Sequence, residues 1–495
     1  MNVQPIFSNK QIPPKKFTEK RFAKKFFAVE RRAHVFSTQA VAQPLTENKN
    51  RAKFIYDSLL DQGDFADSRI QRHRSYSYLL TQLEAAEHID AHLPANPNNL
   101  AAWMADNVKT VGDQYQSYIV DRKGGLPRRF FATKSQALHF LRGVAPTKLV
   151  DGAWLYGVLK QWRSPHMAPL IDTYLDELGR GVADCNHVVL YKKLLAGEGI
   201  DSSVELSEGH YVQGAIQLAL AHHGDSFLPE ILGFNLGYEQ LPLHLLITAY
   251  ELRELGIDPH YFTLHVTIDN LHSGHAQKAL QGIMELLPRV DDGGAFYRRV
   301  IRGYKLNFLG ESTWSIIGGF NLENELVDML GRKSELGRLM HSNHQKIGDR
   351  MVNDWLSSPS AIRKFLAALI DSAWVHPNQD PDKSRFWHLI ADKKAPMAGV
   401  FTSAEQQLIY DWIAGDTKKL ARNKIRTPNE FGDDDKLWGN IAPDINNDGQ
   451  SLQKDIAQLR GKEATLDHLV RYLSPSLHHT LVGLAATRFF ANLLR

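Results

Sequence analysis

Hydrophobic residues recur at every third or fourth position along most of the chain from Lys53 onward. Ala, Leu, Glu, Lys and Gln are frequent in these segments, and runs of β-branched residues are short. Residues three and four apart share one face of a helix, so this spacing is typical of amphipathic helices. The sequence shows no sustained alternation of apolar and polar residues of the kind that strands require. The pattern predicts an all-α protein.

Polar and Gly/Pro-rich stretches interrupt this helical pattern. Short breaks occur at residues 91–99, 122–127, 197–209, 291–294 and 376–381, and a longer polar stretch covers residues 429–450. The breaks and the charge pattern together predict four regions. These are a basic arm at 1–45, an N-terminal helical extension at 46–140, a central helical domain at 141–345 and a C-terminal helical region at 346–495.

Composition excludes several classes of protein. The chain has 495 residues, of which 43% are hydrophobic, and a formal net charge of +3. It contains no run of roughly 18 consecutive apolar residues, and its first residues lack the apolar segment of a secretory signal. We therefore expect a cytoplasmic protein that does not enter a membrane. The single cysteine, Cys185, excludes a disulfide framework and a cysteine-based metal site.

The first forty residues contain a strongly basic segment. The segment Lys15–Arg32 has eight basic residues against two acidic ones and interleaves them with phenylalanines. Such a segment can bind RNA or act as a targeting signal, but its aromatic residues favour an arm that packs on the body of the protein. We expect no nucleic-acid partner.

One predicted helix places three metal-binding side chains on the same side. His265, Asp269 and His272 follow one another at spacings of four and three residues. At about 100° per residue these positions fall within an arc of roughly 60°, so two imidazoles and a carboxylate converge. The residues between them include Leu264, Val266, Ile268 and Leu271. This apolar setting disfavours a solvated polar stripe, and the ligand set is typical of non-haem iron, with zinc or manganese next.

A metal site also needs ligands from other helices. Glu177 and His187 are ten residues apart, which corresponds to about 15 Å along a straight helix. Gly179 and Gly181 lie between them and can break that helix, as a shared site would require.

A further helix is predicted to begin at Pro229. Glu230 lies in its first turn, where an acid already suits the helix dipole. Glu239 has no such structural explanation, because it follows an apolar helix interior.

These residues, in this order along successive helices, resemble the haem-oxygenase-like diiron oxidases and oxygenases, also called iron-containing redox enzymes. The resemblance covers roughly residues 145–345 and is most specific in the His265 to His272 helix. It implies a haem-oxygenase-like helical bundle at 141–345 that binds two Fe(2+) per monomer. The implied ligands are Glu177, His187, Glu239, His265, Asp269 and His272. Glu230 is the substitute for Glu239, and Asp151 is a candidate for an additional carboxylate.

The resemblance implies an iron-dependent oxidoreductase that uses dioxygen on a small amine- or amino-acid-like metabolite. N-oxygenation, carbon–carbon cleavage and desaturation are the reactions to expect. The expected partners are the small-molecule substrate, dioxygen and, in a homodimer, a second copy of the chain. Two alternatives stay open: a metal-dependent hydrolase on the same ligands, and a non-catalytic helical interaction protein that binds no metal.

Two features beyond the metal helix bear on the site. Arg298 and Arg302 share a helical face, which would either anchor a substrate carboxylate or be solvated. His275 would extend the metal helix by one turn, about 80° away from His265. We therefore expect His275 to line the pocket rather than to bind metal.

Overall fold

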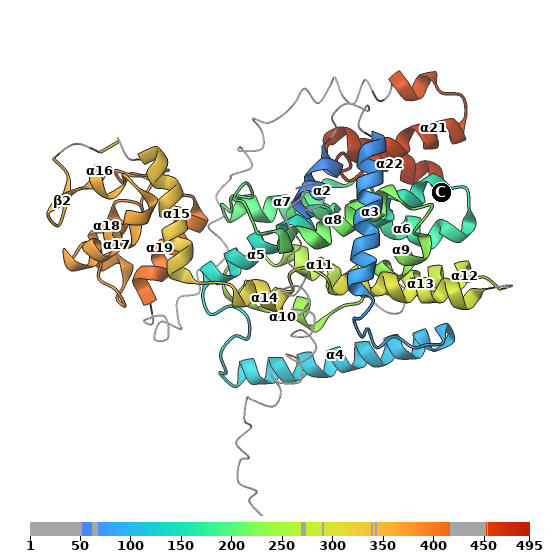
Figure 1. The fold of residues 1–495 in the computed structure, drawn as a ribbon, viewed down its shortest axis with the longest axis horizontal. Helices are drawn as coiled ribbons and strands as arrows, with labels where there is room; N and C mark the ends of the chain where they lie inside the picture. Colours follow the sequence, from blue (N-terminus) through green and yellow to red (C-terminus); the bar gives the residue numbers. More distant parts are fainter. Residues whose placement is uncertain are drawn as a thin grey trace, which may run out of the picture. The chain divides into compact units, whose positions relative to one another are not determined.

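The structure is a computed structural model that describes residues 52–61, 68–268, 274–289, 292–337, 340–341, 344–415, 452 and 454–495. The predicted basic arm at 1–45 lies outside these residues. Regular structure in the described part is almost entirely helical (Figure 1), which confirms the all-α class. The exception is an antiparallel pair of two-residue strands, β1 (Lys346–Ile347) and β2 (Arg350–Met351). Within the described ranges, helices with the length and apolar composition needed to span a bilayer are absent.

The largest hydrophobic core joins helices from both ends of the described chain. Trp154 and Phe234 belong to it and are fully buried. The contributing helices are α2 (Ala52–Leu60), α3 (Ser68–Ala86), the start of α4 (Leu100–Lys123), α6 (Ala168–Glu177), α8 (Glu208–His222), α9 (Leu228–Tyr238), α12 (His275–Leu286), α13 (Gly293–Lys305), α21 (Lys462–Leu469) and α22 (Leu481–Leu494). Helices near residue 480 are therefore packed into the same core as those near residue 170.

Helices α9 and α13 meet at glycines. A Cβ atom on Gly233 would lie 1.8 Å from the carbonyl oxygen of Val300, and one on Gly303 would lie 2.0 Å from that of Glu230. The two backbones can approach this closely only because both residues lack a side chain. This contact fixes α9, and with it the position of Glu239 at the end of that helix.

A second hydrophobic core lies between residues 118 and 317. It is formed by the later part of α4 with α5 (Lys134–Lys148), α7 (His187–Gly197), α10 (Leu243–Glu254), α11 (His260–Ile268) and α14 (Thr313–Gly318). The predicted ligands are divided between the two cores. Glu177 ends helix α6 and Glu239 directly follows α9, both helices of the first core, whereas His187 and His265 belong to helices of the second.

A third core lies between residues 326 and 413. It is formed by α15 (Leu322–Gly337), α16 (Val352–Trp355), α17 (Ile362–Asp371), α18 (Arg385–His388) and α19 (Ser403–Ala414). Asp411 of α19 accepts a hydrogen bond of 2.9 Å from the backbone N–H of Ser135 in the first turn of α5. The predicted region boundaries at 140 and 345 stay predictions.

Short 3-10 segments connect many of these helices. They are η3 (Pro97–Asn99), η4 (Ala153–Gln161), η5 (Pro165–Met167), η6 (Gly179–Gly181), η7 (Ala183–Cys185), η8 (Leu306–Phe308), η9 (Pro359–Ala361), η10 (Pro381–Lys383) and η14 (Val470–Leu473).

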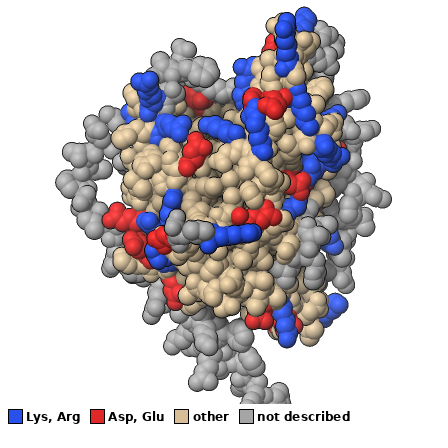
Figure 2. Space-filling model, turned by 90° about the vertical axis from the view of Figure 1, so that its right-hand side faces the viewer, with Lys and Arg blue, Asp and Glu red and all other residues tan. Residues whose placement is uncertain are grey.

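On the face drawn in Figure 2, Lys and Arg side chains are interspersed with Asp and Glu side chains among broad areas of other residues.

A buried carboxylate on α10 organises the segment that precedes α5. Glu251 is fully buried and accepts hydrogen bonds from the Tyr118 hydroxyl (2.7 Å) and from the backbone N–H groups of Arg129 (2.5 Å), Phe130 (3.0 Å) and Phe131 (2.9 Å). We expect Glu251→Gln to lower the free energy of unfolding by about 2 kcal/mol. The neutral amide weakens these charge-assisted bonds, and its NH2 group would face O–H or N–H donors instead of acceptors. Urea unfolding would measure the change.

Tyr118→Phe provides the matched control for this prediction. It removes one of the four donors and leaves the Glu251 carboxylate in place, so the expected loss is about 1 kcal/mol. Equal unfolding midpoints for Glu251→Gln and the unsubstituted protein would show that these bonds do not stabilise the fold.

Candidate metal centre

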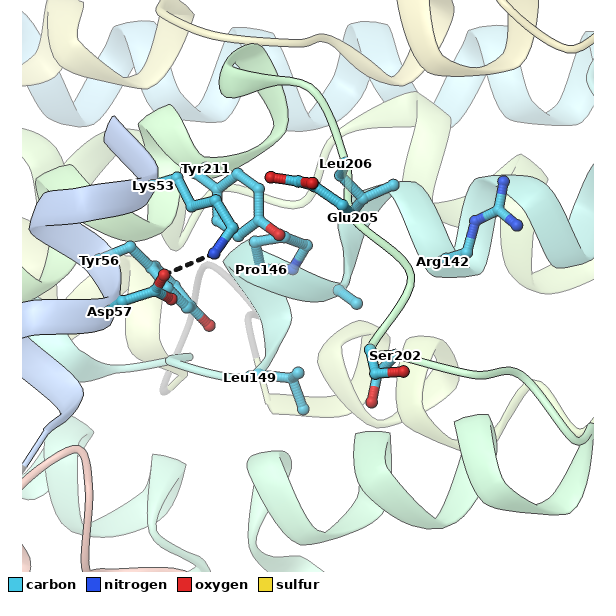
Figure 3. A pocket seen from close by; sticks show the side chains of 12 residues that line it. Lys53, Tyr56, Asp57, Arg142, Pro146, Leu149, Ser202, Glu205, Leu206 and Tyr211 are labelled. Atoms are coloured by element: carbon cyan, nitrogen blue, oxygen red, sulfur yellow. Dashed lines mark hydrogen bonds and ion pairs between the residues drawn. The ribbon is translucent and has the colours of Figure 1, made fainter. Parts of the chain in front are cut away.

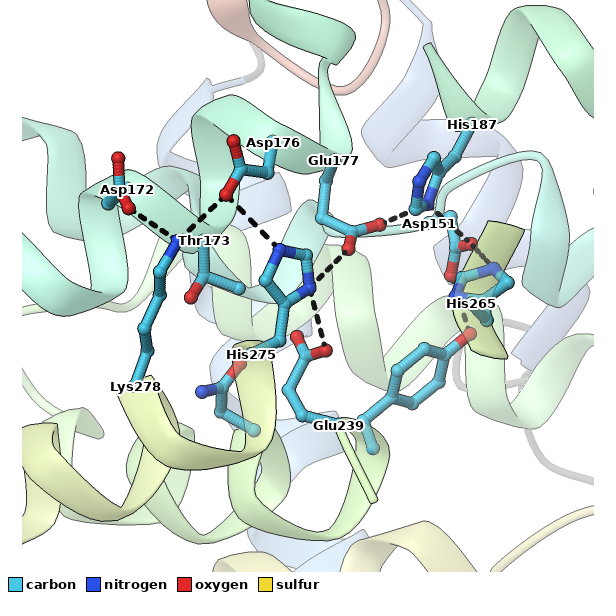
Figure 4. A network of polar contacts seen from close by, with 12 residues as sticks. Asp151, Asp172, Thr173, Asp176, Glu177, His187, Glu239, His265, His275 and Lys278 are labelled. Carbon is cyan, nitrogen blue, oxygen red and sulfur yellow. Dashed lines mark hydrogen bonds and ion pairs between the residues drawn. The ribbon is translucent and has the colours of Figure 1, made fainter. Parts of the chain in front are cut away.

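Two groups of buried residues bring metal-binding atoms together in the described structure (Figure 4). The first group is Asp151, His187 and His265, and the second is Glu177, Glu239 and His275. Within each group the ligand atoms lie within 4.8 Å of one another, and none of the six residues is more than 5% exposed. The groups adjoin, because Glu177 Oε2 lies 2.5 Å from His187 Nδ1. Three carboxylates and three imidazoles thus form one buried cluster.

The turn between Glu177 and His187 has the break that the two glycines predict. Helix α6 ends at Glu177 and α7 begins at His187, with two 3-10 turns between them. Gly179 and Gly181 adopt φ angles of 59° and 81°, in the left-handed region that favours glycine. The chain reverses there, so side chains ten residues apart in the sequence face each other.

Asp151 enters the cluster from the turn that precedes η4. The next residue, Gly152, has a φ of 79°, and a Cβ atom there would lie 2.8 Å from Glu177 Cβ. Glycine therefore lets this turn approach α6. Tyr238 donates a hydrogen bond of 2.6 Å to Asp151 Oδ1, and Tyr261 donates one of 2.5 Å to Oδ2. Two phenols consequently fix the plane of the carboxylate.

Neighbouring charges in the cluster shift the pKa values of its members. Burial alone would raise the pKa of Asp151, but Lys148, His187 and His265 hold that pKa well below its usual range. Burial likewise opposes ionisation of Glu177, yet the charge of His187 lowers the pKa of Glu177 to about 2. Burial would lower the pKa of His187, whereas Glu177 and Asp151 raise it to about 10. The carboxylates are thus ionised and need positive charge beside them, which protonated imidazole or a cation supplies.

The geometry fits a metal better than a set of internal hydrogen bonds. His187 Nδ1 and Glu177 Oε2 are buried and only 2.5 Å apart, yet neither atom makes a hydrogen bond of acceptable geometry within the described residues. Buried ligand atoms that lack a hydrogen-bond partner are candidates for ligands of a metal ion. Imidazole and carboxylate together also suit iron, as well as zinc and manganese.

His275, which was expected only to line the pocket, belongs to the second group of possible metal ligands. Its Nδ1 lies 3.2 Å from Glu177 Oε1 and 3.1 Å from Glu239 Oε2, and its Nε2 lies 3.3 Å from Asp176 Oδ2. Metal-binding histidines are commonly held in this way, with one nitrogen toward the ion and the other toward an outer carboxylate. The expectation assumed one continuous helix, whereas Gly274 is extended and α12 begins at His275.

Outer ion pairs support this arrangement. Lys278 Nζ lies 2.8 Å from Asp176 Oδ2 and also pairs with Asp172. Arg180, which has a φ of 48° in the turn after α6, pairs with both aspartates. These contacts hold Asp176 beside His275 and stabilise an unusual backbone conformation next to Glu177.

The other predicted ligands differ in where they lie relative to the two groups. His265 is buried beside His187, with ring centroids 4.7 Å apart. Glu230 belongs to neither group and forms a bidentate pair with Arg299, at 2.7 and 2.6 Å. Asp269 and His272 lie outside the described residues.

One of the two predicted substrate anchors, Arg298, has an exposed side chain. The Arg298 side chain is 71% exposed, and its recorded ion pair is with Asp292, at 3.9 Å. A separate surface hollow of ≈ 460 Å³ lies between α2, α5 and the chain before α8 (Figure 3). It is lined by Lys53, Tyr56, Asp57, Arg142, Ala145, Pro146, Leu149, Ser202, Ser203, Glu205, Leu206 and Tyr211. None of the six cluster residues is among them.

A comparison with known proteins matched the region that contains the cluster. Residues 138–307 match the model of a protein family described as iron-containing redox enzyme. This confirms the family predicted from the ligand pattern and supports both an oxidoreductase and a site for iron. The match includes all six cluster residues and ends before the third core begins. Neither curated proteins nor solved structures gave a significant match to the chain.

Proposed function

We propose that the protein is a non-haem diiron enzyme that uses dioxygen to oxidise a small amine- or amino-acid-like metabolite. The proposal builds on the match of residues 138–307 to the model of the iron-containing redox enzyme family. The observation that carries the proposal is the pair of adjacent buried groups, each with its own carboxylate and imidazole donors. Two such groups match two metal ions better than one. Their three carboxylates would offset most of the charge of two ferrous ions and leave coordination positions open.

Glu177 has the central part in this proposal. Its Oε2 faces His187 of the first group at 2.5 Å, and its Oε1 faces His275 of the second at 3.2 Å. A carboxylate with one oxygen toward each group is suited to bridge two ions. Asp269 and His272 stay in the proposed ligand set on the strength of the sequence pattern.

The remaining residues hold these ligands in place and keep water out. The phenols of Tyr238 and Tyr261 fix Asp151, and Asp176 orients His275. The helices on both sides contribute buried apolar residues to two cores, so the cluster is shielded from bulk solvent. Two bound ferrous ions would supply the electrons that reduce dioxygen.

Anaerobic loading with ferrous iron tests the proposal. We expect the full-length protein to retain about two irons per chain after removal of excess metal, and to consume dioxygen with the appearance of ferric absorption when air is admitted. Metal analysis, an oxygen electrode and an optical spectrum provide the three measurements. A protein that retains no iron, or that turns over a substrate with zinc and without oxygen uptake, would refute the diiron oxidase.

Two histidine variants extend the same measurement to the second group. We expect His275→Ala to lose about one iron per chain, because Nδ1 of His275 faces both Glu177 and Glu239. His272→Ala tests the ligand that only the sequence pattern predicts. Full iron loading by His275→Ala together with loss in His272→Ala would show that His275 is not a ligand.

A further inference from the structure

We propose that His478 is a positioning residue for His187, and that the C-terminal segment 462–494 is therefore part of the metal centre. This inference rests on the proposed diiron function. The segment lies more than 150 residues beyond the end of the region that matches the family, so the family assigns it no part in the site. It nevertheless covers the turn that brings Glu177 and His187 together.

The segment contacts this turn on both sides. Before the turn, the Tyr174 hydroxyl donates a hydrogen bond of 2.5 Å to the carbonyl oxygen of Leu473. Within it, Arg488 donates one of 3.0 Å to the carbonyl oxygen of Gly181. A Cβ atom on Gly181 would lie 2.4 Å from the carbonyl oxygen of Leu484, so α22 rests directly on the backbone of the turn. The C-terminal helices thus limit how the turn can move.

His478 completes the hydrogen bonds of the residue before His187. The side-chain oxygen of Asn186 accepts a bond of 3.1 Å from the backbone N–H of Val189, which caps the start of α7. The Asn186 side-chain nitrogen donates to the carbonyl oxygen of Leu178 at 3.2 Å and contacts His478 Nδ1 at 3.1 Å. Both ends of the amide are therefore engaged, and Leu178, Asn186 and His478 are buried.

The direction of these bonds defines the state of the histidine. Because the Asn186 nitrogen is a donor, His478 Nδ1 must accept, and the ring carries its proton on Nε2. Burial lowers the pKa of His478 well below its usual range, which keeps the ring in this neutral form. A neutral acceptor at Nδ1 is what the Asn186 amide needs to stay in its capping orientation.

The consequence for the metal centre follows from the position of His187. His187 is the first residue of α7, directly after the cap, and its ring lies 2.5 Å from Glu177 Oε2. An amide that rotates away from the Val189 N–H would loosen the first turn of α7 and displace the imidazole. Partners of metal ligands typically contribute about 10- to 100-fold in metal affinity.

Two substitutions at His478 separate positioning from packing. His478→Leu keeps an apolar side chain in the buried space but removes the acceptor. His478→Asn offers a side-chain oxygen close to the position of Nδ1. In full-length protein we expect His478→Leu to bind ferrous iron about 10-fold or more weakly in an anaerobic titration against a competing chelator, and His478→Asn to recover most of that affinity. Near-UV circular dichroism and the thermal midpoint would show that both variants fold.

His479→Leu is the matched control, because it changes the neighbouring histidine, for which no contact with Asn186 is recorded. We expect it to bind iron as the unsubstituted protein does. Wild-type affinity in His478→Leu, equal weakness in His478→Leu and His478→Asn, or equal loss in His479→Leu would each overturn the positioning role. Failure of the unsubstituted protein to retain iron would overturn the proposed function itself, and this inference with it.

Discussion

Replacing Glu177 by glutamine should remove iron from both positions of the centre. Glu177 is the residue that contacts a ligand of each group, at 2.5 Å from His187 and 3.2 Å from His275. An amide has one oxygen and no charge, so it can neither bridge two cations nor offset their charge. We expect ferrous iron to bind at least about 100-fold more weakly, since even the outer partners of ligands typically account for 10- to 100-fold. Anaerobic titration followed by metal analysis measures this loss.

Asp172→Asn is the control on the same helix. Asp172 is also an acid of α6, but it pairs with Arg180 and Lys278 outside the cluster. Because Asp172 belongs only to the outer ion pairs, we expect this variant to lose much less iron affinity than Glu177→Gln does. Glu177→Gln that still retains about two irons per chain would show that Glu177 is not a bridging ligand. Thermal unfolding of both variants would establish that the comparison is between folded proteins.

The features that sequence analysis predicted well are local ones. Helical periodicity gave the all-α class because residues three and four apart share a face whatever the rest of the chain does. The break between Glu177 and His187 could be predicted from Gly179 and Gly181, since glycine adopts the left-handed conformation without strain. The short hairpin at residues 346–351 left no pattern, because two residues cannot show alternation.

The position of His275 could not be predicted from helical periodicity. The angle between His265 and His275 was calculated on one continuous helix, but Gly274 has an extended backbone and α12 begins after it, at His275. Angles about a helix axis apply only to residues of one continuous helix. The Ser273-Gly274 pair was the available signal, because such a pair commonly marks a turn.

Asp151 shows a second limit. An aspartate before glycine indicates a turn, and the turn is present, with Gly152 at a φ of 79°. The sequence could not reveal that the carboxylate points inward to Tyr238 and Tyr261, which are 87 and 110 residues away. The same holds for His478, which is 292 residues from Asn186. Such partners are chosen by packing between distant segments, and no local pattern encodes them.

Glu239→Gln and Glu230→Gln should have opposite effects on iron and on stability. Both residues are buried acids at the two ends of α9, but their partners differ. Glu239 lies 3.1 Å from His275 in the second group, whereas Glu230 forms a bidentate pair with Arg299. We expect Glu239→Gln to lose about one iron per chain, because the amide is a poor ligand for iron.

The same logic predicts that Glu230→Gln retains both irons and has a lower free energy of unfolding. A neutral amide cannot keep the charge-assisted bidentate contact with Arg299, and a weakened partner leaves polar atoms of a 2%-exposed side chain poorly satisfied. Iron analysis and urea unfolding of the two variants form a crossed comparison, in which each serves as the control for the other. Iron loss in Glu230→Gln with full loading in Glu239→Gln would reverse the assignment and make Glu230 the ligand, because only the acid that binds the ion should be needed to retain it.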